Sequence, residues 1–89
     1  MNTNRSTNSQ QLAENRTPLP AFIAMETLVV EPIAERMGIL PNDVGNEYDL
    51  DFIFVQVLTF DSINGQEGFL LNPDVPEDKF WEIVALCKI

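Results

Sequence analysis

Hydrophobic residues along the chain gather in blocks whose composition and spacing favour β-strands. The first block, Ala21 to Val30, is apolar except for Glu26 and Thr27, and its β-branched residues predict a strand. The second block, Asp51 to Phe60, consists largely of β-forming residues and predicts a strand that is apolar on both faces. Glu26 is unusual in such a block, because a lone carboxylate is costly to bury and must face water or a partner.

A β-hairpin is predicted directly after the second block. Asn64-Gly65 is a dipeptide that favours tight two-residue turns, because both residues tolerate a positive φ. Glu67 to Leu71 then predicts the partner strand. The segment from Asn72 to Asp78 contains two prolines, which cannot donate to a strand ladder, so we expect a loop there.

A short helix is predicted over residues 31–38. Glu31-Pro32 suits a helix start, because proline is favoured at the first helical position and an acid complements the helix dipole. Gly38 is a typical helix end. Residues 39–50 contain a proline, a glycine and several acids, and therefore predict a loop. The apolar positions with helical spacing inside the predicted helix are Ile33, Ala34 and Met37.

The last segment, Lys79 to Ile89, fits two structures from its local pattern. Val75-Pro76-Glu77-Asp78 is a suitable helix start, which favours a helix. Alternation of apolar residues favours a strand instead. The helical pattern uses Phe80, Ile83, Val84 and Cys87, and the strand pattern uses Trp81, Ile83, Ala85 and Cys87.

Length and composition predict one folded domain behind a polar tail. Residues 1–17 lack periodicity and predict a mobile tail, and residues 18–89 predict the domain. The hydrophobic fraction of 45% is ordinary for a folded chain. With 89 residues, the core is only marginally sufficient without disulfides or metals.

The distribution of charge says more about the class of function than the overall composition does. The formal net charge is −9, and the stretch from Glu26 to Asp78 holds twelve acidic residues against one basic residue, Arg36. Such a field repels nucleic acids and anionic membranes and attracts basic surfaces, many of which are DNA-binding clefts. The acids therefore suggest a mimic of DNA, although acids of this number can also serve only to keep a small protein soluble.

Residue types needed for common catalytic chemistry are missing. The chain has no histidine, the commonest general base and metal ligand, and no glycine-rich phosphate loop. Cys87 is the single cysteine, so we expect a buried free thiol and neither a disulfide nor a metal site. No apolar run reaches the length of a membrane span or resembles a signal peptide. We therefore expect a cytoplasmic binding protein with no cofactor, and not an enzyme.

The second half of the chain resembles a known family. The resemblance rests on three motifs. They are Phe60-Asp61, the predicted strand residues Phe69-Leu70-Leu71, and the run from Asp74 through Pro76-Glu77 and Lys79 to Trp81. They are similar to the C-terminal half of the Ugi-like family of phage uracil-DNA glycosylase inhibitors. Upstream, Met25–Val30 followed by Pro32 and Gly38 looks like the first strand and helix of that family. The likeness covers residues 24–85, and its motifs are of moderate specificity.

This resemblance implies a fold and a function. The fold would be α+β, a small antiparallel sheet of about four or five strands with one or two short helices. The C-terminal segment would be a strand. The function would be that of a DNA-mimicking inhibitor, monomeric when free, which binds one uracil-DNA glycosylase molecule in its DNA-binding cleft and blocks uracil excision.

The resemblance also implies site residues. The acids in place of DNA phosphates would be Glu26, Glu31 and Glu35. A hydrophobic pocket that receives an apolar side chain of the enzyme would be lined by Val30, Ile33, Met37, Phe69, Leu71 and Val84. Gln56 departs from the family, which has an apolar residue there. On local grounds Trp81 suits an anchor under the sheet. The apolar residues that suit a core better than a pocket on the same grounds are Ile33, Met37, Phe69, Leu71 and Val84.

Other classes of function stay open from the sequence alone. One is an acidic DNA mimic directed at a restriction, CRISPR or nucleoid protein. Another is an antitoxin or immunity protein that neutralises a basic partner. A small enzyme is a third class, and bound metal or ligand would be its first sign.

Overall fold

Helices dominate residues 17–89, the part of the chain that the structure, a computed structural model, describes. The predicted mobile tail lies outside this part, except for Thr17. The elements follow in the order α2 (Ala21–Ala24), η1 (Met25–Val30), α3 (Glu31–Met37), α4 (Pro41–Glu47), α5 (Leu50–Val57), β1 (Leu58–Ile63), β2 (Gln66–Leu71) and α6 (Glu77–Leu86).

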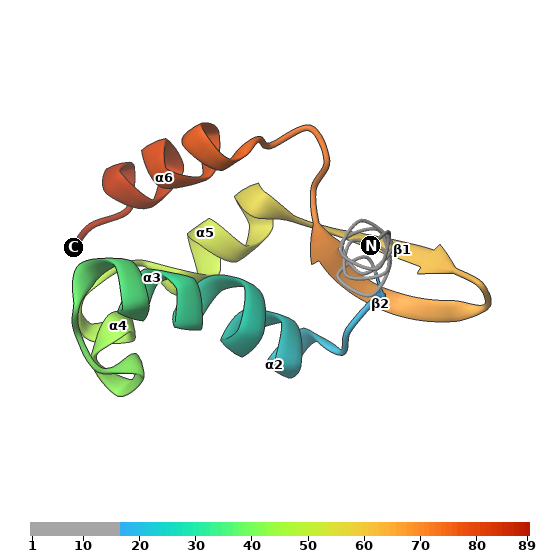
Figure 1. Cartoon of the computed structure of the whole chain (residues 1–89), viewed down its shortest axis with the longest axis horizontal. Coiled ribbons are helices and arrows are strands. Elements are labelled where there is room, and N and C mark those ends of the chain that lie inside the picture. The colour runs from blue at the N-terminus through green and yellow to red at the C-terminus, as the bar shows by residue number, and fades with distance from the viewer. Residues whose placement is uncertain (1–16) are drawn as a thin grey trace, which may run out of the picture.

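Three of these elements form one continuous helix, which we call the long helix: α2, η1 and α3. It lies along one side of the molecule and α6 along the other, with α5 between them in contact with both η1 and α6 (Figure 1). The hairpin of β1 and β2 extends from one end of this arrangement, while α4 folds back against α3 at the other. The C-terminus lies near the α3–α4 end.

The predicted sheet of four or five strands is wrong. Within residues 17–89 the only sheet has two antiparallel strands, β1 and β2, with Phe60 opposite Phe69. Leu19 adds a single bridge on the far edge of β2. The predicted hairpin itself is confirmed, because Asn64 and Gly65 take φ values of 55° and 80° in the turn.

The block Ala21 to Val30 is helical, although its composition predicts a strand. A wide π-helical turn, η1, precedes Pro32, and the N–H of Glu31 donates to the carbonyl of Glu26 five residues back. Proline has no N–H to donate, and its ring crowds the carbonyl four residues earlier, so a widened turn lets the helix continue through Pro32. The helix therefore begins ten residues before the predicted start, but it ends at Gly38 as predicted, with φ of 68°.

Residues 39–57 are also more helical than predicted. Pro41 opens α4 at the first helical position, where its missing N–H costs nothing. The Asp49 side chain then accepts a hydrogen bond from the N–H of Phe52 at 3.2 Å and caps α5. Ile53 and Val57, four residues apart, are both fully buried by this helix. The predicted loop and the first part of the predicted second strand are therefore helices, and the strand begins only at Leu58.

The C-terminal segment is the helix α6, so the strand implied by the family resemblance is wrong. Phe80 and Val84 lie one turn apart and are both buried, and Cys87 follows three residues later. Glu77 and Asp78 occupy the first turn, where acids complement the helix dipole. The local helix-start pattern thus identified the correct alternative.

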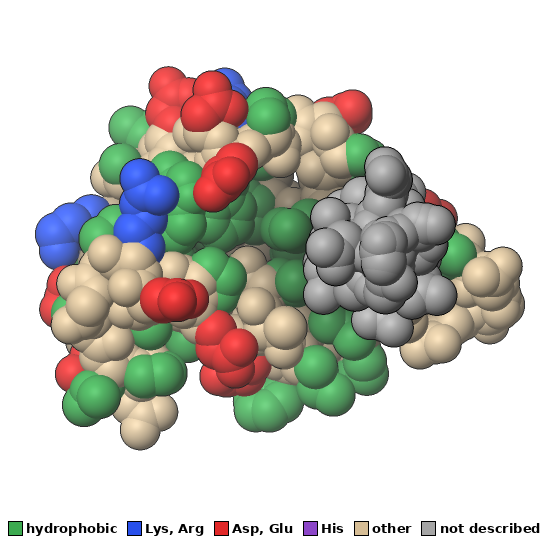
Figure 2. Space-filling view, in the orientation of Figure 1, with side chains coloured by type: hydrophobic (Ala, Val, Ile, Leu, Met, Phe, Trp, Pro, Cys, Tyr) green, Lys and Arg blue, Asp and Glu red, His purple; other side chains and the backbone are tan. Residues whose placement is uncertain are grey.

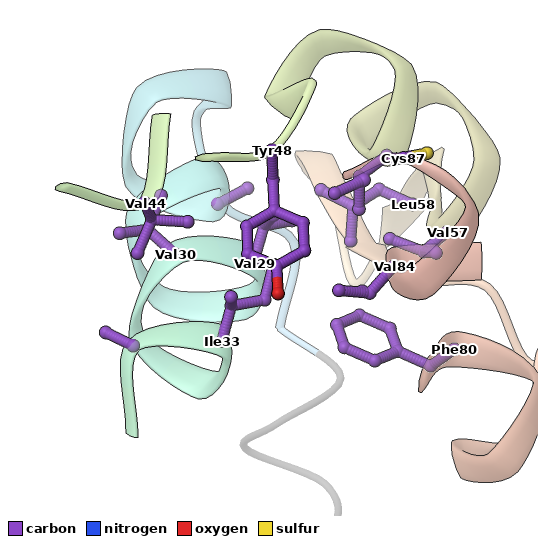
Figure 3. Close-up of a cluster of buried hydrophobic side chains, with 13 residues drawn as sticks. Val29, Val30, Ile33, Val44, Tyr48, Val57, Leu58, Phe80, Val84 and Cys87 are labelled. Carbon is purple, nitrogen blue, oxygen red and sulfur yellow. The ribbon is translucent and has the colours of Figure 1, made fainter. Parts of the chain in front are cut away.

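The core lies where the long helix, α4, α5 and α6 meet. Tyr48 projects between Ile33 on one side and Phe80 with Val84 on the other (Figure 3). Val29, Val30 and Val44 belong to the same cluster as Ile33. Val57, Leu58 and Cys87 complete its other side. No buried side chain of the described residues is polar or charged apart from the Tyr48 hydroxyl and the Cys87 thiol, so apolar burial stabilises this core.

A glycine fixes the position at which the chain enters the domain. The N–H and carbonyl of Leu19 both pair with Phe69, at 2.9 and 2.7 Å. A Cβ on Gly68 would lie 2.6 to 2.9 Å from backbone atoms of Leu19. Only glycine therefore allows this close approach of the two backbones.

We expect Gly68→Ala to lower the free energy of unfolding by about 1–2 kcal/mol, because Leu19 must move and two backbone hydrogen bonds are lost. Gly45→Ala is the matched control, since its Cβ would meet only the flexible end of Leu50, at 3.3 Å. Alanine is also the better helix former, so this control should be neutral or stabilising. Urea unfolding followed by circular dichroism measures both, and equal losses would contradict the backbone clash.

Candidate functional site

An apolar pocket opens between the long helix and α6. Its volume is about 320 Å³, and its lining comes from four parts of the chain. Figure 2 shows it as an apolar hollow with acidic side chains on both of its sides. The lining residues are Leu28 in η1, Pro32 in α3, Leu71 at the end of β2, Val75 in the following loop, and Glu77, Phe80 and Trp81 in α6.

Aromatic packing forms one wall of this pocket. The rings of Phe80 and Trp81 meet edge to face at a centroid distance of 4.8 Å. The guanidinium of Arg36 lies over the Trp81 ring, 4.4 Å from its centre, and so joins α3 to α6. Trp81 is thus a half-buried pocket residue, and not an anchor under a sheet.

Of the six residues predicted to line a pocket, only Leu71 lines this one. It is 47% exposed at the end of β2. Val30, Ile33 and Val84 are core residues with at most 3% exposure. Met37 is exposed near the end of α3 and Phe69 packs between two other phenylalanines, so neither reaches the pocket.

The three predicted mimic acids all lie on the long helix. Glu31 and Glu35 are exposed and one turn apart on α3, and Glu31 directly precedes the pocket residue Pro32. Glu26 is half-buried in η1. On the other side of the pocket, Glu77 lines the wall and Asp78 follows it in the first turn of α6. The pocket therefore lies between two acid-bearing helices.

Most carboxylates in residues 17–89 have no ion-pair partner within that range. Only Glu47 and Glu82 form ion pairs there, with Lys88 at 3.3 Å and Lys79 at 3.9 Å. The other eleven acids of this range form no ion pair within it, so no described basic side chain offsets their charge. Because the Lys88 ammonium also lies 5.2 Å from the centre of the Tyr48 ring, this lysine fastens the chain after α6 to the end of α4.

Cys87 is buried and free, as predicted. Burial raises the pKa of its thiol, and the carboxylate of Asp49 raises it further, so the thiol stays protonated and is a poor nucleophile.

Within residues 17–89, no three acidic or cysteine side chains converge so as to hold a metal ion. The same part of the chain contains no helix with the length and apolar character that crossing a bilayer requires.

Sequence reasoning missed most of the pocket because it read two helices as strands. Leu28 and Pro32 face the pocket four residues apart, which is a helical and not a strand spacing. Likewise, Glu77, Phe80 and Trp81 lie on one helical face, with spacings of three and four. The helical alternative for the C-terminal segment would have indicated this second set of residues.

Comparisons with models of protein families, with curated proteins and with solved structures found no match to this chain.

Proposed function

We propose that this protein binds a basic, nucleic-acid-binding surface of another protein and blocks that surface by mimicking DNA. The observation that carries the proposal is the apolar pocket between two helices that bear exposed acids, Glu31 and Glu35 on α3 and Glu77 and Asp78 on α6, none of which has an ion-pair partner in residues 17–89. A complementary surface on the partner protein would be apolar at its centre and basic at its rim.

The two features have different physical tasks. Carboxylates along a surface can replace phosphates opposite arginine, lysine and backbone N–H donors. They mainly speed association and select basic partners, because exposed charges are screened and contribute modest affinity. An apolar side chain of the partner supplies most of the binding energy, because it is removed from water when it enters the pocket.

Uracil-DNA glycosylase is the first target to test, because the motifs from Asp74 to Trp81 resemble its inhibitors. The helical fold differs from the sheet that this resemblance implies, so the fold gives no support for that target. Support comes instead from the acids and the pocket, which fit the same kind of partner.

The decisive experiment titrates a bacterial uracil-DNA glycosylase with this protein and follows uracil excision from DNA. We expect stoichiometric loss of activity. Unchanged excision at large excess and low salt would remove this enzyme as the target. Immobilised restriction, CRISPR and nucleoid proteins would then test the wider proposal, and failure to bind any basic nucleic-acid-binding protein would contradict it.

The acids on α3 should govern how fast the complex forms. We expect the double variant Glu31→Gln/Glu35→Gln to slow association about tenfold at low salt, because two charges beside the pocket are lost. Asp61→Asn/Glu67→Gln removes the same charge from the hairpin and is the matched control. Stopped-flow association at several salt concentrations measures both. Equal slowing would mean that only net charge matters, and a salt-independent rate would contradict electrostatic mimicry.

A further inference from the structure

A second exposed apolar surface lies where α2, η1, α5 and the hairpin meet. We call it the aromatic patch and define it by Phe22, Met25, Phe54, Phe60 and Phe69. Phe54 and Phe60 each meet Phe69 edge to face, with ring centres 5.0 and 5.2 Å apart. Phe22 and Phe60 at its two ends are 78% and 59% exposed. The patch shares no residue with the apolar pocket.

The patch has both a projection and a hollow. Phe22 projects from the first turn of the long helix. Beside it lies a hollow of about 340 Å³, lined by Ala21, Phe22, Met25, Asp51 and Phe54. An aromatic side chain can enter a hollow of this size. A surface that carries both shapes can match a second copy of itself across a two-fold axis.

Charge indicates which occupant suits the patch. Asp51 is the only charged residue that lines the hollow, so a basic partner gains little there compared with the acid-bearing helices beside the pocket. A second copy presents an equally apolar face, and it brings a Phe22 of its own. The patch therefore matches a second copy better than it matches the basic partner of the proposed function.

The exposed area is also of the size that a small dimer needs. At roughly 200 Å² for each aromatic side chain, the exposed parts of Phe22 and Phe60 supply roughly 270 Å² of apolar surface per copy, and the half-buried Met25, Phe54 and Phe69 add to it. A standard interface covers about 800 Å² per partner, and about 65% of a homodimer interface is apolar, which is roughly 500 Å². The patch thus supplies most of the apolar centre of such an interface.

We propose that the aromatic patch is the contact face of a homodimer, in which Phe22 of each copy enters the hollow beside Phe54 of the other. The contact uses no residue that lines the apolar pocket. The homodimer differs from the free monomer that the family resemblance implies. It does not depend on the target of the proposed function.

The test is the molar mass of the full chain, measured by sedimentation equilibrium across the micromolar-to-millimolar range at low and high salt. We expect a rise from the 10.1 kDa of one chain towards twice that mass. Salt should strengthen the dimer, because it screens repulsion between two chains of charge −9. Salt should instead weaken binding to a basic partner, because it screens the attraction between opposite charges. The two proposals can therefore fail separately.

A pair of substitutions locates the contact. Phe22→Ser should weaken the dimer about 30-fold, as truncation of a central interface aromatic does. Leu86→Ser is the matched control, because Leu86 is 80% exposed at the far end of α6. Circular dichroism checks that both variants fold. A mass of 10.1 kDa under every condition would overturn the proposal and leave the patch to a different apolar partner. Equal weakening by both variants would overturn it as well.

Discussion

Ile33→Ala is expected to lower the free energy of unfolding by about 3 kcal/mol, within the usual range for truncating a buried isoleucine. Ile33 has no exposed surface and lies beside Tyr48 in the cluster that joins the long helix to α6. Removal of its outer carbons leaves a cavity that a well-packed core fills only in part. Since small domains are marginally stable, this loss is a large fraction of the total. Urea unfolding followed by circular dichroism measures it.

Met37→Ala is the control for this prediction. Met37 lies one turn further along α3 and is 42% exposed, and the resemblance implies the same pocket role for it as for Ile33. Its truncation should change the free energy of unfolding by only about 0.5 kcal/mol, as surface substitutions generally do. If Ile33→Ala instead kept full stability and weakened partner binding, Ile33 would line a pocket and the core described above would be wrong.

Leu71→Lys should weaken binding to the target about 30-fold relative to its matched control, Leu86→Lys. Leu71 lines the apolar pocket, and a lysine there places an ammonium where the partner's apolar side chain would lie. A loss of this size corresponds to about 2 kcal/mol, which is typical of a central interface residue. The readout is the concentration of each variant that halves uracil excision, or the Kd for whichever basic protein proves to be the target.

The control separates the pocket from the charge. Leu86→Lys makes the same substitution and the same change in net charge, but at an exposed position outside the pocket. Both variants should retain the helical spectrum, because both leucines are exposed. Equal weakening would show that charge alone holds the complex together, and the apolar pocket would then have no part in the proposed function.

Local chemistry predicted the features that depend on one or two residues. Asn64-Gly65 indicated its turn, because the positive φ of that turn is accessible to these two residue types. Gly38 indicated the end of α3 for the same reason. The burial of Cys87 was expected because a free cysteine is among the residue types most often buried. The acid excess, which supports the proposed function, is a property of composition and needs no structure.

The long segments were harder, because an apolar run without clear alternation suits a buried helix as well as a buried strand. Val29 and Val30 have β-branched side chains, yet both are buried in η1, where packing against α5 outweighs their intrinsic preference. Pro32 indicated a helix start, but the preceding π-helical turn accommodates its missing N–H inside the helix.

By itself, then, the sequence determined the charge, the turn, the helix end and the absence of histidine chemistry, since each is a property of single residues or neighbours. Only the tertiary structure decided that most of the apolar blocks are helices, because the free energy of burial depends on which faces meet. It also decided which apolar residues form a core and which form a surface. Ile33 and Leu71 are equally apolar, and only their neighbours make one a core residue and the other a pocket wall.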